Sequence, residues 1–341
     1  MLESDINGCY DSIRKGSHSF FSASKLLPKN IRDPAVVLYA FCRLADDSVD
    51  QKGAPNDAVD ILRERLDKAY AGKPINESVD RAFASLIVLS EMPRALPEAL
   101  LEGMDWDSAN LKYETLSDLH AYSARVASAV GVMMCVLMNV RDKDVLARAC
   151  DLGAAMQLTN IARDIGEDAR NGRLYIPLRW MAEEGLDINR FLNNPEPGKR
   201  VGRIAKRLLA EAERLYSRAE AGLSELPFSC RPGIFAARHI YEQIGKHIAA
   251  ADYDSITKRA FTTKMEKLSF LLLSVANSAT VSLMPRSAIV HAEPLEEMRF
   301  LINATSVYQS NKGLIDRKAG AVMNILEQME RRDRRYQTVL E

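Results

Sequence analysis

Apolar residues recur at helical spacing along most of the 341-residue chain. No stretch alternates apolar and polar residues over a strand length between hairpin turns, and no strand-helix-strand rhythm occurs. The pattern therefore predicts an all-α protein. Helices are expected within 5–27 and over 34–50, 58–71, 115–140, 157–170, 199–223, 233–252 and 268–284. Pro34 is expected to open its helix, a position that proline favours.

The helix at 157–170 carries a polar stripe inside an otherwise apolar surface. Four polar residues stand at i, i+3, i+7 and i+11, on one face of a helix with about 3.6 residues per turn. They are Gln157, Asn160, Asp164 and Asp168. Two carboxylates one turn apart suit Mg²⁺, or Mn²⁺, completed by substrate phosphates. A solvated acidic face is the alternative interpretation. Glu167 lies off the stripe and is expected at the surface.

The helix at 34–50 repeats this arrangement more than a hundred residues earlier. Its stripe follows i, i+4, i+7 and i+11, with Asp47 at its edge and apolar residues elsewhere. The residues are Tyr39, Arg43, Asp46 and Asp50. A solvated face explains one such helix easily and two poorly. Placed face to face, the two helices would enclose several carboxylates, which share a cavity only if cations neutralise them or some are protonated.

Two long apolar runs bear on what lies beside these aspartates. The run at 126–140 is apolar nearly all round, which is typical of a buried core helix. It could equally wall a tunnel for a long hydrocarbon, with Gly131 and Gly153 making room and Tyr122 at the entrance. The run at 268–284 falls short of the roughly 20 apolar residues needed to span a membrane. A buried helix is the favoured interpretation, and peripheral membrane contact stays open.

Smaller clusters offer donors for an anion. Ser17 and Ser19 stand in a donor-rich turn beside Phe20, although a helix cap would look the same. Arg259 lies in a short basic segment that suits diphosphate, although a plain solvated loop explains it as well. Asp107 is expected to be an ordinary residue of a helix surface.

Composition narrows the class of protein. Lysine plus arginine and aspartate plus glutamate number 46 each, so the net basic charge that favours nucleic acid is absent. The five cysteines stand singly, as in a reduced cytoplasmic protein, and the N-terminus has no apolar signal core. No dinucleotide-binding or P-loop motif and no zinc-type spacing occurs. A hydrophobic cavity capped by aspartates, basic residues and tyrosines would suit a prenyl diphosphate.

The chain resembles the squalene/phytoene synthase family over about residues 10–275, closest to its bacterial phytoene synthases. The resemblance rests on LYAFCRLADDSVD at 38–50 and AMQLTNIARDIGEDARNGRLYIP at 155–177. SHSF at 17–20 and YSARVASAVG at 122–131 support it. It implies an isoprenoid-synthase helical bundle around a central hydrophobic cavity, over residues 1–285. Residues 286–341 are expected to form a polar, peripheral helical extension.

The resemblance also implies an activity and roles for residues. Two geranylgeranyl diphosphates would condense head to head (1′-1), through a cyclopropyl diphosphate, to phytoene, without NADPH. The alternative is the same reaction on farnesyl diphosphate, giving squalene or dehydrosqualene. The implied metal ligands are Asp46, Asp50, Asn160, Asp164 and Asp168. Contacts to the diphosphates and tails are implied for Ser17, Ser19, Phe20, Arg43, Gly131, Gln157, Tyr241 and Arg259, and contacts to the reacting carbons for Tyr39, Tyr122 and Tyr175.

Location and partners follow less directly from the residues. The expected location is the cytoplasm, with peripheral contact at the inner membrane left open because substrate and product are lipids. No nucleic-acid partner is expected. The sequence does not determine the oligomeric state.

Overall fold

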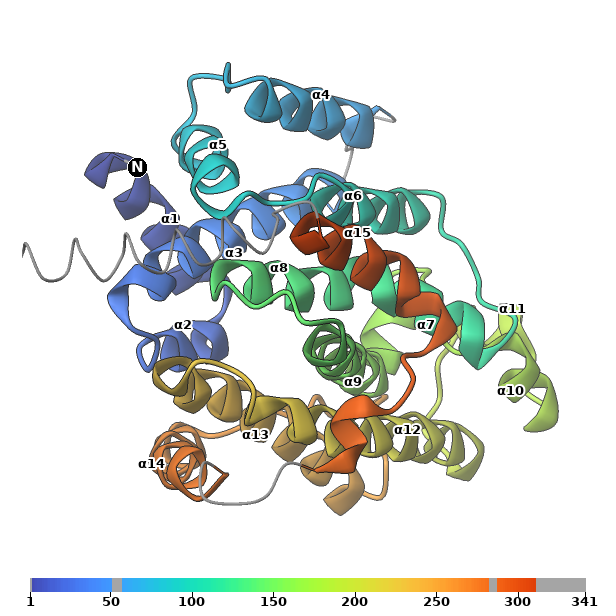
Figure 1. Cartoon of the computed structure of the whole chain (residues 1–341). Helices are drawn as coiled ribbons and strands as arrows, with labels where there is room; N and C mark the ends of the chain where they lie inside the picture. Colours follow the sequence, from blue (N-terminus) through green and yellow to red (C-terminus); the bar gives the residue numbers. More distant parts are fainter. Residues whose placement is uncertain (1, 51–56, 282–286, 311–341) are drawn as a thin grey trace, which may run out of the picture.

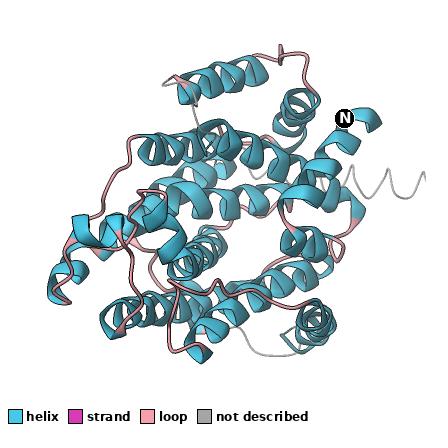
Figure 2. Cartoon of the chain, turned by 180° about the vertical axis from the view of Figure 1, so that it is seen from behind, coloured by secondary structure: helices cyan, strands magenta, loops and turns pink. Residues whose placement is uncertain are grey.

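The computed structural model describes residues 2–50, 57–281 and 287–310, except for the side chains of residues 18, 19, 50 and 307–310. Across these ranges the fold is all-α, as predicted, and contains no strand (Figure 2). The longer helices enclose one core. They are α1 (Glu3–Gly16), α2 (His18–Ser24), α3 (Lys29–Asp50), α4 (Ala58–Tyr70), α5 (Ser78–Ser90), α6 (Ala95–Ser108), α7 (Leu116–Ser123), α8 (Ala129–Leu137), α9 (Lys143–Arg170), α12 (Lys199–Leu223), α13 (Arg231–Ala250), α14 (Lys264–Val281) and α15 (Arg299–Ser310).

Short elements join these helices. They are the π-helical turn η1 (Ala124–Ser128), α10 (Leu178–Glu183), α11 (Ile188–Asn193) and the 3-10 turns η2 (Phe228–Cys230), η3 (Ala288–His291) and η4 (Glu296–Met298). The helix expected over 115–140 is therefore interrupted at η1. The helix expected from Pro34 begins earlier, at Lys29, and Pro34 lies inside it.

Helix α9 is the centre of the bundle (Figure 1). Asp142 caps its N-terminus by accepting hydrogen bonds from the backbone N–H groups of Asp144 and Val145. In Figure 1, α8 lies on one side of α9, and α12 and α13 lie on the other. Gly153 permits η1 to pack closely on α9 as well, because a Cβ there would stand 2.7 Å from Cα of Ser128. The predicted metal-binding stripe therefore lies on a helix that other helices surround.

Gly131 has the same packing role one helix away. A Cβ on Gly131 would stand 2.8 Å from the backbone oxygen of Ala149, so the absence of a side chain brings α8 against α9. The run containing Gly131 is also the part of the described chain long and apolar enough to cross a membrane, at Leu116–Leu137. Most of its apolar window, 61%, is buried inside the bundle, as in a core helix.

Two predictions about the C-terminal third are wrong. The apolar run at 268–281 is not a buried helix, because α14 packs on α13 at the edge of the bundle and exposes several leucines. The described start of the predicted extension is not peripheral, because Met298, Leu301 and Thr305 are fully buried against the bundle. The domain boundary at residue 285 lies outside the described residues and stays a prediction.

Candidate active site

An apolar cavity of about 360 Å³ runs beside α9, within the usual range of small-molecule sites. The residues of α9 that line it extend from Asn160 back to Val145, a distance of about 22 Å along the helix at 1.5 Å per residue. Helices α2, α3, α8, α12 and α13 complete the wall. The tunnel predicted from the apolar run at 126–140 is therefore present, and Gly131 lines it.

The far end of the cavity, which no sequence pattern located, is closed by α12 and α9. Val145 and Arg148 line it from α9, Leu223 lines it from the last residue of α12, and Leu226 lines it from the loop that follows. Arg148 is 1% exposed and bonds to Asp151, so its charge is compensated behind the wall. The cavity thus has an apolar floor and, at Asn160, a polar end.

The aspartates of α9 stand at that polar end. Asp164 accepts hydrogen bonds from Nε of Arg163 at 2.9 Å and from Nε of Arg259 at 2.8 Å. Burial opposes ionisation of Asp164, but the two arginines outweigh it and lower its pKa. Arg259 reaches Asp164 from a loop 95 residues away, and its predicted contact with diphosphate stays a prediction. Arg259 also reaches Glu167, at 3.2 Å, and Glu167 is exposed as expected.

Close packing at Gly166 holds the loop that carries Arg259. The Gly166 N–H donates to the carbonyl of Ser255 at 3.0 Å. A Cβ on Gly166 would stand 2.7 Å from Cα of Ile256, so a larger residue would displace the loop. Arg170 adds a hydrogen bond to the Ile256 carbonyl at 3.2 Å. No pattern in the sequence indicates this contact.

Two groups on α9, a carboxyl and an amide oxygen, are not fully compensated by the described residues. Burial and the neighbouring Asp164 raise the pKa of Asp168 to about 7. Oδ1 of Asn160 is buried and accepts no hydrogen bond from any described residue. A carboxyl that resists ionisation and an orphaned amide oxygen are both stabilised by a cation. This donor set, all oxygen, fits Mg²⁺.

The described residues do not hold a metal cage of their own. No three acidic, histidine or cysteine side chains among them converge on one point. Mg²⁺ commonly takes one or two carboxylates together with substrate phosphates, so an incomplete protein ligand set is compatible with it. Asp164, Asp168 and Asn160 are the groups of α9 that would hold the ion.

The second predicted stripe, on α3, contributes to the same cavity. Tyr39 and Cys42 line it from α3, as Gln157 and Asn160 do from α9. Arg43 bonds to Asp46 at 3.1 Å and contacts Asp47 at 2.5 Å, so these charges are paired along the helix. The side chain of Asp50 lies outside the described residues, and its predicted role stays a prediction.

Aromatic rings stand between α2, α3 and α13. The Phe20 ring lies 6.1 Å from the Tyr39 ring and 5.8 Å from the Tyr241 ring. Burial raises the pKa of Tyr39 to about 12, so its phenol is neutral. A Cβ on Gly16 would strike the Tyr39 hydroxyl, at 2.3 Å, so Gly16 leaves room for it.

The turn at 17–20 adopts the capping arrangement that the sequence left open. Ser17 is the N-cap of α2, and its hydroxyl accepts a hydrogen bond from the Phe20 N–H at 3.3 Å. The side chain of Ser19 lies outside the described residues. Contact of either serine with diphosphate therefore stays a prediction.

Asp107 is half-buried and bonds to two of the predicted site tyrosines, so the expectation of an ordinary surface residue is wrong. Its carboxylate accepts hydrogen bonds from Tyr122 at 2.9 Å and from Tyr175 at 2.7 Å. The rings of these tyrosines stack with centroids 5.2 Å apart, and Tyr113 joins them. Asp107 also helps to raise the pKa of Asp168, which places its charge near the α9 aspartates. The sequence offered only the position of Asp107 beside Trp106, which indicates nothing about this contact.

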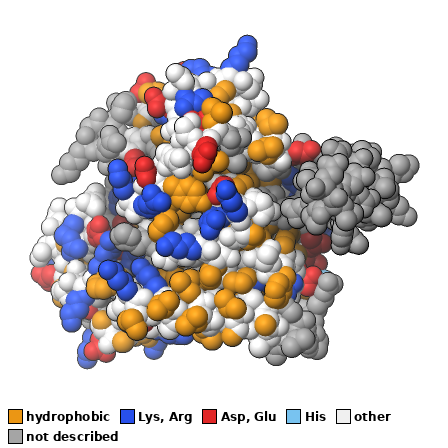
Figure 3. All heavy atoms as spheres, turned by 90° about the vertical axis from the view of Figure 1, so that its left-hand side faces the viewer, with side chains coloured by type: hydrophobic (Ala, Val, Ile, Leu, Met, Phe, Trp, Pro, Cys, Tyr) orange, Lys and Arg blue, Asp and Glu red, His pale blue; other side chains and the backbone are white. Residues whose placement is uncertain are grey.

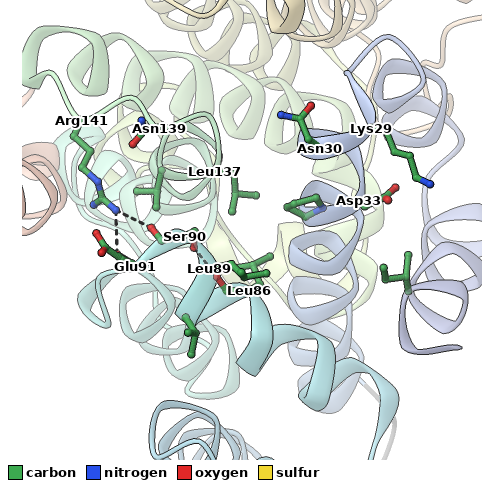
Figure 4. A pocket seen from close by; sticks show the side chains of 14 residues that line it. Lys29, Asn30, Asp33, Leu86, Leu89, Ser90, Glu91, Leu137, Asn139 and Arg141 are labelled. Atoms are coloured by element: carbon green, nitrogen blue, oxygen red, sulfur yellow. Dashed lines mark hydrogen bonds between the residues drawn. The ribbon is translucent and has the colours of Figure 1, made fainter. Parts of the chain in front are cut away.

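A larger hollow of about 780 Å³ lies on another face and contains none of the predicted site residues. It is bounded by the start of α3, the end of α5 and the end of α8 (Figure 4). Two of its charged groups are already engaged. Arg141 donates to the carbonyls of Ser90 and Glu91, and Asp33 accepts from Tyr10. Nothing there resembles a reaction centre.

The comparisons with known proteins agree with this geometry. A family model described as squalene/phytoene synthase matches residues 13–266. A phytoene synthase of Cereibacter sphaeroides is 52% identical over 346 residues, covering 98% of this chain and 96% of the relative. One of Rhodobacter capsulatus is 52% identical over 337 residues, covering 98% of both chains. The crystal structure of a dehydrosqualene synthase in complex with ligand superposes with a TM-score of 0.75 at 29% identity, covering 82% of this chain and 98% of that one.

Fold and site together define an all-α synthase of the isoprenoid type, with oxygen ligands at one end of an apolar tunnel. The chain belongs to the squalene/phytoene synthase family.

Proposed function

We propose that the protein catalyses phytoene synthesis, in which two geranylgeranyl diphosphates condense head to head through a cyclopropyl (prephytoene) diphosphate and release two diphosphates. The observation that carries this proposal is the apolar cavity that ends at Asn160 beside Asp164 and Asp168. The relatives that are 52% identical over 98% of the chain are phytoene synthases. The farnesyl alternative has weaker support, since the dehydrosqualene synthase is 29% identical.

The polar end of the cavity would bind the diphosphates. Asp164, Asp168 and Asn160 on α9, with Asp46 and Asp50 on α3, would hold Mg²⁺, with Mn²⁺ as a possible substitute. Bound there, the metal supplies charge neutralisation that makes diphosphate a better leaving group. Arg43 and Arg259 now pair with aspartates and are positioned to exchange these contacts for phosphate oxygens.

The remaining residues would protect and orient the cations that follow ionisation. The cavity wall is apolar, so it excludes the water that would quench an allylic cation. Asp107 fixes the phenols of Tyr122 and Tyr175 through its two oxygens, and these aromatic rings would help to stabilise a cation at the polar end of the site. Tyr39 and Phe20 line the apolar cavity itself, whereas Tyr122 and Tyr175 are not among its lining residues. None of these steps needs a reductant.

Cellular location is a further part of the proposal. The single cysteines, buried or half-buried and all free in the structure, are compatible with the cytoplasm. The substrate and product are lipids, so we expect peripheral contact with the inner membrane.

Product identification tests the proposed function. Purified protein would be given Mg²⁺ and either geranylgeranyl or farnesyl diphosphate, and the extracted hydrocarbon identified by mass spectrometry. We expect a C40 hydrocarbon, phytoene, with no requirement for NADPH. A C30 product formed faster from farnesyl diphosphate would replace this proposal with the squalene or dehydrosqualene alternative.

A further inference from the structure

Helix α14 has polar residues on the face that packs against the protein and apolar residues on the face that is exposed, the opposite of an ordinary surface helix. The positions that point into the protein carry serines: Ser274 is 0% and Ser278 is 1% exposed. Their hydroxyls donate to carbonyls of their own helix, at 2.6 Å each, and so need no solvent. The outward stripe is instead apolar. It consists of Met265, Leu268, Leu272 and Val275, exposed by 75%, 52%, 68% and 53%.

The outward face also lacks charge along most of its length. No Asp, Glu, Lys or Arg occurs between Leu268 and Val281, whereas a solvated helix face normally carries them. Phe261, 72% exposed, extends the surface beyond the N-terminus of the helix. Figure 3 shows apolar side chains gathered in a band along the lower part of this side of the molecule. Contiguous apolar surface of this kind marks a binding face.

This apolar face begins at the rim of the candidate active site. Phe261 follows two residues after Arg259, whose guanidinium bonds to Asp164. Helix α14 packs on α13 and α2, and both of those helices line the cavity. A partner on this face would therefore lie next to the route by which an apolar molecule enters or leaves.

Basic residues gather at the same end of the face. Lys258 and Lys264 are exposed, and Lys267 is half-buried. The one acidic residue of α14, Glu266, is occupied by Thr263 and lies 2.8 Å from His247. The charge beside the apolar stripe is thus positive, which complements an anionic surface.

We propose that α14 is a membrane-docking helix, with Met265, Leu268, Leu272 and Val275 buried in the interfacial zone of a lipid bilayer. Its lysines lie at the level of anionic headgroups. The docked orientation brings the rim at Arg259 to the bilayer surface. The reason for docking there rests on the proposed function, in which substrate and product are lipids, whereas the docking itself does not depend on it.

Vesicle flotation of the purified full chain tests this proposal. The chain would be mixed with phosphatidylcholine vesicles with and without phosphatidylglycerol, at matched lipid concentration. The test variant is Leu268→Glu with Leu272→Glu. The matched control is Val88→Glu with Leu89→Glu on α5, where the side chains are 72% and 71% exposed on a different element. Turnover in detergent micelles would be measured for all three proteins.

We expect the chain to float with anionic vesicles, the α14 variant to lose about tenfold or more of this partitioning, and the α5 variant to keep it. Turnover in detergent should be equal in all three, which separates docking from chemistry. Absence of flotation by the unaltered chain, or equal flotation by both variants, would overturn the proposal. So would flotation that appears only after removal of residues 311–341, since that segment would then cover the face. A third outcome would assign the face to self-association instead. In it, the unaltered chain does not float, light scattering shows it to be a dimer, and only the α14 variant is monomeric.

Discussion

Nε of Arg259 lies 2.8 Å from Oδ1 of Asp164, although 95 residues separate them along the chain. The contact places an exposed positive charge, 58% accessible, beside a carboxylate predicted to bind metal. When diphosphate and metal enter, the guanidinium can transfer to phosphate oxygens, because charge-assisted hydrogen bonds to phosphate are strong.

Arg259→Gln should therefore weaken substrate binding more than chemistry. We expect KM for geranylgeranyl diphosphate to rise about 10- to 100-fold, the equivalent of one or two hydrogen bonds to a charged group. Steady-state kinetics would measure it, with Lys258→Gln, an exposed neighbour of the same charge, as the control. An unchanged KM for Arg259→Gln would remove the residue from the diphosphate site.

Asp107→Asn should lower turnover without unfolding the protein. The asparagine amide keeps one acceptor oxygen for the two phenols and loses the negative charge of Asp107. One phenol would lose its partner, and Tyr122 and Tyr175 would no longer be aligned for the cation. We expect kcat to fall by about 10- to 100-fold. The control is Asp105→Asn on the same helix, since Asp105 pairs with Arg63 instead. Equal losses of kcat in both variants would mean that any lost carboxylate on α6 lowers turnover, which would contradict a specific role for Asp107.

The raised pKa of Asp168, about 7, predicts a pH dependence of stability without metal. An unfolded aspartate has a pKa of about 3.9, so between these values the native state binds more protons than the unfolded state. The contribution of Asp168 therefore destabilises the native state increasingly as pH rises from about 4 to 7. Below about pH 4 the effect is absent.

Thermal melting measures this contribution. In chelator, the unaltered protein should lose about 3 kcal/mol of stability relative to Asp168→Asn between pH 5 and pH 8, because about two units of the shift lie within that range at about 1.4 kcal/mol each. Mg²⁺ with diphosphate should reverse the loss at pH 8 in the unaltered protein alone. The exposed Asp60→Asn variant should follow the unaltered protein. Parallel curves for the unaltered protein and Asp168→Asn would mean that Asp168 is not a buried, unpaired carboxyl.

Ala219→Leu should shift the substrate preference toward the shorter chain. Ala219 is 1% exposed and lines the cavity, so a leucine would fill space near the floor. We expect the ratio of geranylgeranyl to farnesyl turnover to fall about tenfold or more. Ala212→Leu is matched in helix and burial but does not line the cavity. Each change should cost about 1–3 kcal/mol by overpacking, which melting curves would report. A ratio that falls equally in both variants would contradict the assignment of the floor.

The sequence predicted the parts of the site that lie on single helices. The stripes of α3 and α9 are local, because 3.6-residue periodicity alone aligns their side chains. The sequence did not predict contacts between distant segments. Asp107 bonds to Tyr175, 68 residues away, and Gly166 packs against the loop at Ser255. The position of α14 was also missed, because apolar composition suggested burial. Its serines at i and i+4, Ser274 and Ser278, were the available signal that its leucines face outward.

Diphosphate release by the Asp164→Ala variant tests the central claim most directly, since Asp164 joins the α9 stripe, the basic loop and the proposed metal. With geranylgeranyl diphosphate and saturating Mg²⁺, the unaltered protein should release two diphosphates for each C40 hydrocarbon. Asp164→Ala should keep its helical circular dichroism and lose at least about 1000-fold in rate, the equivalent of several kcal/mol of lost charge stabilisation. A folded variant that releases diphosphate at the unaltered rate would contradict the account.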